Sequence, residues 1–327
     1  MTWHSARSTR PGRSARVPEL RRDPVSGRWV CLAPGRAARP ETPHGREMRR
    51  FQAPGFECPF CPGHEAMTPP EVEAVRGPGG KPDGPGWSVR VVPNLFPAFT
   101  AEGAEARLDD PMHQVVPALG TSEVIIHSPD HRRWLPYLPA EQASLVMVTT
   151  WRRYLSNAVP HMATVVPLYN HGPGAGASLD HPHGQLFAAS QPGPELEIET
   201  AGAKRAFRDV KGCVFCHMVA VEEAAGVRVI TSDEQFVAIA PWASRGPFEC
   251  WIIPRDHRAD FGLVSEPGAG ELGGFLRAVL WRIARELDDP DLNWYIHSLP
   301  HAGGEDAVAY HWHLEIRPRV AEIAGFE

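Results

Sequence analysis

The chain of 327 residues is 43% hydrophobic, which is enough for two domains with cores of their own. Its net charge of −6 argues against a protein built for nonspecific binding to nucleic acid. No apolar run approaches the roughly 18 residues of a membrane-spanning helix, so we expect a protein that makes no membrane contact.

The first segment of the chain is basic, contains serine and has no acidic residues. It also lacks the apolar stretch of a secretory signal. We therefore expect residues 1–16 to form a disordered tail, with a transit peptide as the alternative interpretation. A cytoplasmic location is the default expectation for such a chain.

Four of the six cysteines fall into two C-x-x-C pairs. These are Cys58 with Cys61, and Cys213 with Cys216, whereas the remaining two cysteines are scattered. In a large chain without a secretion signal, such pairs are typical of a metal site or a redox site rather than of a disulfide framework.

Two segments of the chain match each other in residue types and spacing. Residues 120–131, "GTSEVIIHSPDH", and residues 246–257, "GPFECWIIPRDH", both begin with glycine and carry glutamate three residues later. Each continues through an apolar stretch and a proline to Asp-His, and a helical pattern begins eight residues after that. A C-x-x-C pair lies upstream of each segment, and a His-x-His lies 50 or 54 residues downstream of the Asp-His. We interpret this match as an internal repeat.

The repeat predicts two fused half-domains of one fold. Predicted strands outnumber predicted helices and short connections join several of them, which favours an α+β fold in which each half is an antiparallel sheet with packed helices. We place the half-domains at residues 17–192 and 193–327, and we expect residues 190–211 to link them. The predicted strands are 89–92, 163–168, 185–189, 227–231, 235–240, 294–298 and 311–316. The two helices begin near Pro139 and Ser265, with apolar positions at Leu145, Val148, Trp151 and Leu155 in the first and Leu272, Phe275, Leu276, Val279, Ile283 and Leu287 in the second.

Each half contains a set of residues that suits a structural zinc ion. Zinc prefers four thiolate or imidazole ligands in a tetrahedron, and a C-x-x-C turn places two thiolates close together. The alternative is that the cysteines are buried and unligated, and it weighs more for the second pair because "CVFC" lacks the proline-rich turn of "CPFCPG". The predicted ligand sets are Cys58, Cys61, His131 and His181 in the first half and Cys213, Cys216, His257 and His311 in the second.

Assigning His181 to a metal leaves His183 free beside a rigid anchor. In an extended backbone the two side chains point to the same side, and Pro182 between them stiffens the tripeptide. Histidine can act as a covalent nucleophile, so His183 is the predicted catalytic residue. Gln185, two residues further on, is the second predicted catalytic residue, since it offers an amide donor for a phosphoryl oxygen.

The glycine-rich run "GPGAGAS", residues 172–178, directly precedes this segment. Such a run can bring backbone N–H groups close to an anion. Ser178 and Asn170 add polar groups at its two ends. Taken alone the glycines are typical of an ordinary loop, but their position before "HPHGQ" favours anion binding.

At this point the residues resemble a known family, the galactose-1-phosphate uridylyltransferases of the histidine triad superfamily. The resemblance begins near residue 18 and covers most of the chain. It rests on these segments in this order: "RRDPVSGRWVCLAPGRAARP" (21–40), "CPFCPG" (58–63), "VVPNLFPAF" (91–99), "SPDH" (128–131), "HPHGQ" (181–185), "PFECWIIPRDH" (247–257) and "GFE" (325–327).

The resemblance implies a homodimer that works by a ping-pong reaction. His183 would attack the α-phosphorus of the nucleotide sugar UDP-glucose, release glucose 1-phosphate, and pass the uridylyl group to a second hexose 1-phosphate. The family's zinc ligands match Cys58, Cys61, His131 and His181. Its substrate-binding positions match Arg36, Arg39, Asn94, Asn170, Ser178, Gln185, Gly325 and Phe326.

The chain also departs from that family's pattern. Glu315 and Arg317 stand where many members carry histidines that bind a second metal, and Leu95 stands where many carry an aspartate near the ribose. The second C-x-x-C resembles instead a branch with two Cys2His2 zinc sites, which includes ADP-glucose phosphorylase-like adenylyltransferases. An ADP-glucose or dinucleoside polyphosphate phosphorylase is therefore the alternative, and a non-catalytic zinc-stabilised nucleotide-binding module is the alternative of another class.

Overall fold

The structure is a computed structural model that describes residues 19–32, 57–102, 107–108 and 114–320. Its centre is a ten-stranded sheet in which all neighbouring strands are antiparallel. The strand order is β10 (Val229–Ser232), β11 (Phe236–Ile239), β12 (Cys250–Pro254), β14 (His313–Pro318), β13 (Leu292–His297), β8 (Thr164–His171), β9 (His183–Ala189), β7 (Gly120–Ile126), β4 (Trp87–Pro93) and β3 (Glu73–Arg76). Two short hairpins lie outside it, β1 (Glu19–Arg22) with β2 (Trp29–Leu32) and β5 (Arg107–Leu108) with β6 (Gln114–Val115).

The sheet consists of two matching five-stranded sets that meet at its middle. Read outward from the centre, the order is β8, β9, β7, β4 and β3 in one set and β13, β14, β12, β11 and β10 in the other. The sets join through the antiparallel pair β8–β13, in which Asn170 lies opposite Asn293. The predicted α+β class with antiparallel pairing is confirmed, and the two expected sheets are continuous with each other. The division at residues 192 and 193 stays a prediction.

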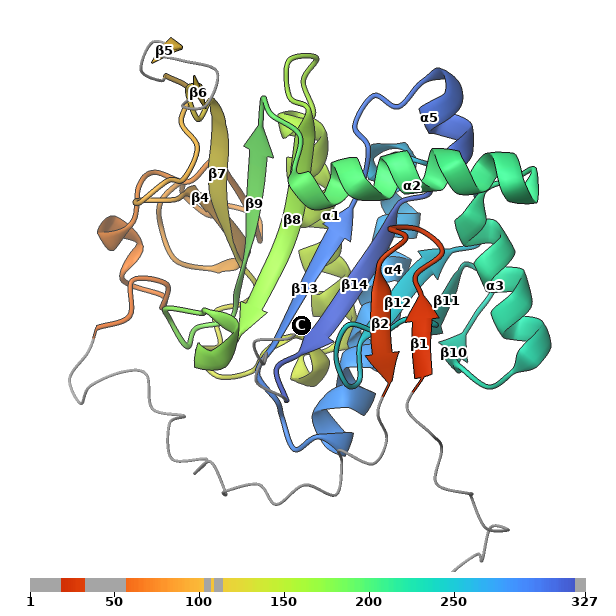
Figure 1. Cartoon of the computed structure of the whole chain (residues 1–327). Helices are drawn as coiled ribbons and strands as arrows, with labels where there is room; N and C mark the ends of the chain where they lie inside the picture. The colour runs from red at the N-terminus through yellow and green to blue at the C-terminus, as the bar shows by residue number, and fades with distance from the viewer. Residues whose placement is uncertain (1–18, 33–56, 103–106, 109–113, 321–327) are drawn as a thin grey trace, which may run out of the picture.

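Two long helices cover one face of the sheet. They are α1 (Ala140–Asn157) and α4 (Glu266–Glu286), which lie behind the strands in Figure 1 and begin where the sequence predicts. The expected apolar face of α4 is buried except for Leu287. The expected face of α1 is wrong in detail, since the most deeply buried side chains include Val146, Met147 and Tyr154, while Leu155 is exposed. The predicted face of α1 is half-buried because α1 packs closely against α4. Gly273 of α4 permits this approach, since a Cβ added to it would lie 2.4 Å from the Ala143 carbonyl oxygen.

The opposite face of the C-terminal set is covered by α2 (Pro194–Val210), α3 (Val214–Ala225) and the β1–β2 hairpin (Figure 1). The segment expected to be a simple link is thus a helix whose Leu196 and Ala203 enter the core. The hairpin packs so closely on α2 that a Cβ on Gly202 would lie 1.6 Å from the Val25 carbonyl oxygen. Among the described residues no helix combines the length and apolar character needed to cross a membrane.

Candidate functional site

The first predicted ligand set comes together on the face of the sheet opposite α1 and α4. Cys58 and Cys61 lie on the loop before the short helix η3 (Glu65–Met67), while His131 and His181 come from the loops after β7 and before β9. The Cys61 Sγ lies 3.3 Å from His131 Nδ1 and 3.6 Å from His181 Nδ1, and Cys58 Sγ lies 3.7 Å from His181 Nδ1. A tetrahedral zinc with its usual bond lengths separates sulfur from nitrogen by about 3.6 Å. The donor set and its spacing therefore suit zinc.

The hydrogen bonding of His181 and the pKa of Cys58 determine how this cluster would bind a cation. His181 Nε2 donates to the Ser128 carbonyl oxygen at 2.8 Å, which leaves Nδ1 free toward the thiols. Burial and the neighbouring Cys61 raise the pKa of Cys58 to about 11. A bound divalent cation would lower that pKa and deprotonate the thiol.

The second predicted ligand set forms a cluster of the same kind. The Cys216 Sγ lies 3.4 Å from His257 Nδ1 and 3.5 Å from His311 Nδ1, and Cys213 Sγ lies 4.0 Å from His311 Nδ1. His257 Nε2 donates to the Ala307 carbonyl oxygen at 2.9 Å. The thiols sit at the start of α3, a helix that the sequence analysis did not predict. Both sets of four are candidates to hold a metal ion.

His183 begins β9 and lies outside the first metal cluster. Its Nδ1 donates to the His181 carbonyl oxygen at 2.7 Å, and its ring lies 5.0 Å from that of Phe60. Burial lowers the pKa of His183 while the hydrogen bond to His181 raises it, and the balance is a pKa below the usual range. Among the described residues none forms a hydrogen bond with Nε2. At neutral pH the imidazole is therefore neutral, with its proton on Nδ1 and a lone pair on Nε2.

Two other predicted residues, Gln185 and Asn170, lie near His183 on the same face of the sheet. Gln185 follows along β9, half-buried, opposite Leu168 of β8. Tyr169 of β8 pairs with Gly184 of β9, and the two strands are antiparallel. The next residue of β8, Asn170, therefore lies beside the preceding residue of β9, His183. Ser178 is exposed at the end of the glycine-rich loop.

Asn94 follows β4, where its Oδ1 accepts from the Phe96 amide at 2.9 Å. Four predicted substrate residues lie outside the described part of the chain, and they are Arg36, Arg39, Gly325 and Phe326.

The equivalent positions of the second half carry different chemistry. His313 repeats the hydrogen bond of His183, from Nδ1 to the His311 carbonyl oxygen at 3.1 Å, but the whole residue is inaccessible to solvent. Glu315 occupies the position of Gln185, and its Oε1 lies 3.8 Å from His313 Nε2. A buried carboxylate would repel a phosphoryl group where an amide would attract one. Of these two matching histidines, His183 is therefore the one suited to phosphoryl chemistry.

A third cluster of potential ligands surrounds His313. It joins Glu199 of α2 to strands β13 and β14, and its ligand atoms all lie within 4.8 Å of one another. No sequence pattern reveals this cluster, because Glu199 and His297 match no motif and come together only in the folded chain. Its members are Glu199, His297, His313 and Glu315.

Cationic neighbours already pair with the carboxylates of this third cluster. His297 Nδ1 lies 2.6 Å from Glu199, while Arg245 and Arg317 reach Glu315 at 2.5 and 2.9 Å. Burial by itself lowers the pKa of His297, but Glu199 outweighs it and the pKa rises to about 9. Both carboxylates therefore already have cationic partners within the protein, and we interpret the cluster as a structural ion-pair network.

This network predicts a pH-dependent stability. The folded pKa of His297 exceeds its unfolded value of about 6.5, so its contribution is complete below pH 6.5 and is lost as the pH rises through about 9. Replacing Glu199 by Gln should lower the free energy of unfolding by about 3–5 kcal/mol, because it leaves a buried charge unpaired. Urea unfolding at pH 6.5 and 9 measures both effects. The control is Glu223→Gln, in the exposed pair with Arg255, with an expected loss below about 1 kcal/mol.

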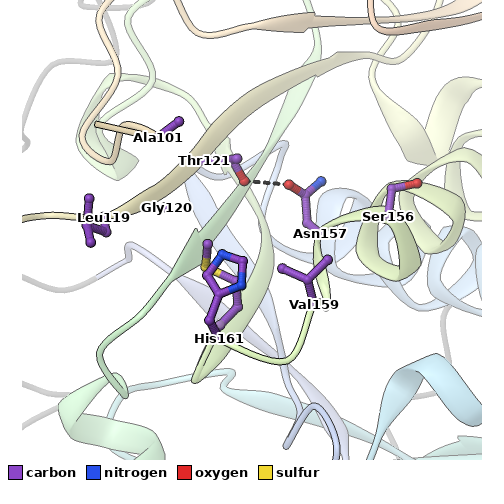
Figure 2. A pocket seen from close by; sticks show the side chains of 9 residues that line it. Ala101, Leu119, Gly120, Thr121, Ser156, Asn157, Val159 and His161 are labelled. Atoms are coloured by element: carbon purple, nitrogen blue, oxygen red, sulfur yellow. Dashed lines mark hydrogen bonds between the residues drawn. The ribbon is translucent and has the colours of Figure 1, made fainter. Parts of the chain in front are cut away.

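A small cavity lies elsewhere, at the far end of the same strands. Figure 2 shows its lining, where Thr121 of β7 hydrogen-bonds the side chain of Asn157 at the end of α1. Gly120, also in the lining, pairs with Ala189 at the opposite end of β9 from His183. From His183 to Ala189 the strand advances by six residue steps, or about 20 Å. This cavity is therefore distinct from the His183 site.

The chain is similar to known enzymes over most of its length. A family model described as the N-terminal domain of galactose-1-phosphate uridyl transferase matches residues 9–192. The ADP-glucose phosphorylase of Arabidopsis thaliana is 33% identical over 315 residues, which cover 95% of this chain and 87% of that protein. The galactose-1-phosphate uridylyltransferase of Haemophilus influenzae is 27% identical over 310 residues, which cover 91% and 82%.

A solved structure supports the same relationship. The crystal structure of an ADP-glucose phosphorylase from Arabidopsis thaliana with bound ADP-glucose superposes with a TM-score of 0.78 at 32% identity. The match covers 95% of this chain and 92% of that one. The match therefore spans both five-stranded sets of the sheet.

Proposed function

Because the chain belongs to the galactose-1-phosphate uridylyltransferase family and is a nucleotidyltransferase, we propose that it transfers a nucleotidyl group from a nucleotide sugar through a covalent intermediate on His183. The observation that carries this proposal is the hydrogen bond from His183 Nδ1 to the His181 carbonyl oxygen at 2.7 Å. It fixes the tautomer, because Nδ1 holds the proton, and leaves the lone pair on Nε2, which accepts no hydrogen bond from any described residue. A neutral imidazole so held is ready to attack without a separate general base.

The reaction has two steps that mirror each other. In the first, the His183 Nε2 lone pair forms a bond to the α-phosphorus, and the bond from that phosphorus to the bridging oxygen breaks, releasing a hexose 1-phosphate. In the second, a phosphate oxygen of the acceptor attacks the same phosphorus and the P–N bond breaks, which regenerates His183. Each leaving group is a stabilised anion or the imidazole itself, so catalysis depends on positioning and charge. The Gln185 amide donates to a phosphoryl oxygen in both steps.

Zinc in the two Cys2His2 clusters would act as a structural cross-link. In the first cluster it would tie the loop of Cys58 and Cys61 to the strand that begins with His183. A closed set of four protein ligands has no open position for substrate. The chain's own residues therefore perform the chemistry, while the metal holds His181 and its carbonyl oxygen in place.

We infer that the preferred donor is ADP-glucose and the acceptor is phosphate, as the name of the ADP-glucose phosphorylase implies. The support is the higher identity to that relative, 33% against 27%, together with the second Cys2His2 cluster. The second candidate is UDP-glucose–hexose-1-phosphate uridylyltransferase, which the match of residues 9–192 to the uridyl transferase model favours.

Exchange of labelled glucose 1-phosphate tests the function and the donor together. Wild-type protein mixed with ADP-glucose or UDP-glucose, with no acceptor added, should incorporate label into the nucleotide sugar, because the first step is reversible. We expect exchange with ADP-glucose to exceed that with UDP-glucose by about tenfold or more, since a base-specific site discriminates by one or more hydrogen bonds. The opposite preference would identify the uridylyltransferase, and no exchange with either donor would contradict covalent transfer.

A further inference from the structure

We propose that Asn293, on strand β13 of the C-terminal half, is a positioning residue that fixes the amide of Asn170 so that it donates to the substrate. The proposal rests on the nucleotidyl transfer at His183 inferred above. It adds a residue of the second half to a site whose predicted nucleophile and metal ligands belong to the first.

The side-chain amide of Asn293 can adopt only one orientation. Its Nδ2 lies 2.7 Å from Asn170 Oδ1 and 2.8 Å from the Ala175 carbonyl oxygen, and its Oδ1 lies 2.7 Å from Arg319 Nε. A backbone carbonyl can only accept, and a guanidinium can only donate. If the amide were turned over, its oxygen would face the Ala175 carbonyl oxygen and its NH2 group would face the Arg319 guanidinium. Neither pair can form a hydrogen bond, so the positions of oxygen and nitrogen in this amide are fixed. Asn293 is 7% exposed, and both the oxygen and the nitrogen of its side-chain amide form hydrogen bonds within the protein.

The orientation of Asn293 determines that of Asn170. Because Asn293 Nδ2 donates, Asn170 must present its oxygen to Asn293 and keep its own Nδ2 for another partner. Within the described part of the chain no residue accepts a hydrogen bond from Asn170 Nδ2. Asn170 lies beside His183 across the β8–β9 pair, so this donor suits a phosphoryl or ribose hydroxyl oxygen of the nucleotide.

Asp291, just before β13, holds the glycine-rich loop from the same side. Its Oδ2 accepts from the Gly174 amide at 2.6 Å, and its carboxylate fills the space where a Cβ on Gly172 would lie 1.9 Å from Oδ1. Gly172 has a φ of +81°, which a glycine adopts without strain. Asp291 and Asn293 thus hold two neighbouring residues, Gly174 and Ala175, of the turn at Pro173–Ala175. This turn leads to Ser178 and then to the catalytic segment.

Asn293→Asp tests the proposal, because a carboxylate cannot donate and would repel both Asn170 Oδ1 and the Ala175 carbonyl. We expect the Kd for AMP and UMP, measured by titration calorimetry on the full chain, to rise about 10–100-fold for whichever nucleotide the wild type binds. Asn293→Ala, which adds no charge, should raise it about tenfold. A double-mutant cycle combines Asn293→Ala with Asn170→Ala. Because Asn293 acts through Asn170, the rise in Kd of the double variant should be about tenfold smaller than the product of the rises in the two single variants.

The matched control is Asn157→Asp, the same substitution at an asparagine that is also 7% exposed but lies at the cavity of Figure 2. It should lower Tm and leave Kd within about twofold of wild type. An Asn293→Asp variant that lowers Tm but keeps its Kd, or effects that multiply fully in the cycle, would overturn the proposal. Label exchange by the wild-type protein distinguishes a failure of this proposal from a failure of covalent transfer at His183. If the wild type shows no exchange, covalent transfer is contradicted whatever the Kd of the variants.

Discussion

His183→Ala should abolish nucleotidyl transfer, with a fall in kcat of at least about 10⁴-fold. The variant loses the only atom that forms a bond to phosphorus, and among the described residues no second nucleophile takes the position of Nε2. The substitution removes a side chain that makes one hydrogen bond, to the His181 carbonyl oxygen, so the fold should persist. Steady-state rates with the preferred donor, together with thermal unfolding of the same preparation, measure the two quantities separately.

The control for that experiment is a substitution of the corresponding histidine in the second half, His313→Asn. His313 has the same place in the second half and the same backbone hydrogen bond, but it is fully buried beside Glu315. We expect the folded protein to keep its transfer activity, with a lower Tm because a buried ring is lost. If the His183→Ala protein is active, or if the His313→Asn protein is folded but inactive, the assignment of the nucleophile to the first half is contradicted.

Cys58→Ala should remove one metal ion per chain and destabilise the protein by on the order of 5 kcal/mol or more, because structural zinc supplies folding free energy. We expect Tm to fall by ~10 °C or more. Activity should fall as well, because a metal bound there would hold His181, whose carbonyl oxygen fixes the tautomer of His183. Elemental analysis of the purified variant and its unfolding curve measure these effects.

Cys250→Ala is the control for the loss of a buried thiol without a metal. Cys250 is fully buried in β12, and burial raises the pKa of its thiol, so it is a small apolar side chain. The variant should keep two zinc ions per chain and lose at most about 2 kcal/mol. A wild-type protein without a bound transition metal, or a Cys58→Ala protein with unchanged metal content, would contradict the assignment of the first cluster.

The sequence predicts well those features that recur at matching positions. The repeated Gly-x-x-Glu and Asp-His segments locate β7 and β12, and the helices that follow begin within a residue or two of the expected positions. The two Cys2His2 sets also follow from the repeat, because C-x-x-C, Asp-His and His-x-His occur in the same order in both halves. The placement of His183 beside but outside the cluster follows from the alternation of side chains along a strand.

Other features could not be predicted because they depend on tertiary contacts. The helical segment α2 lacks an N-cap side chain, as Gly193 precedes it, and its packing face is recognisable only against the sheet and the hairpin of Val25. The pair of Glu199 with His297 joins residues 98 apart in the sequence. The contact of Asn293 with Asn170 joins residues 123 apart and exists only because β13 and β8 meet at the centre of the sheet.

The most direct test of covalent transfer is the intact mass of the protein after mixing with a nucleotide sugar in the absence of acceptor, followed by peptide mapping. We predict a gain of one nucleotidyl group per chain, with the modified peptide containing residues 181–185 and the modification on His183. The gain should disappear on addition of phosphate or hexose 1-phosphate. An unmodified protein that nevertheless turns over substrate, or a nucleotidyl group on any other residue, would contradict the account.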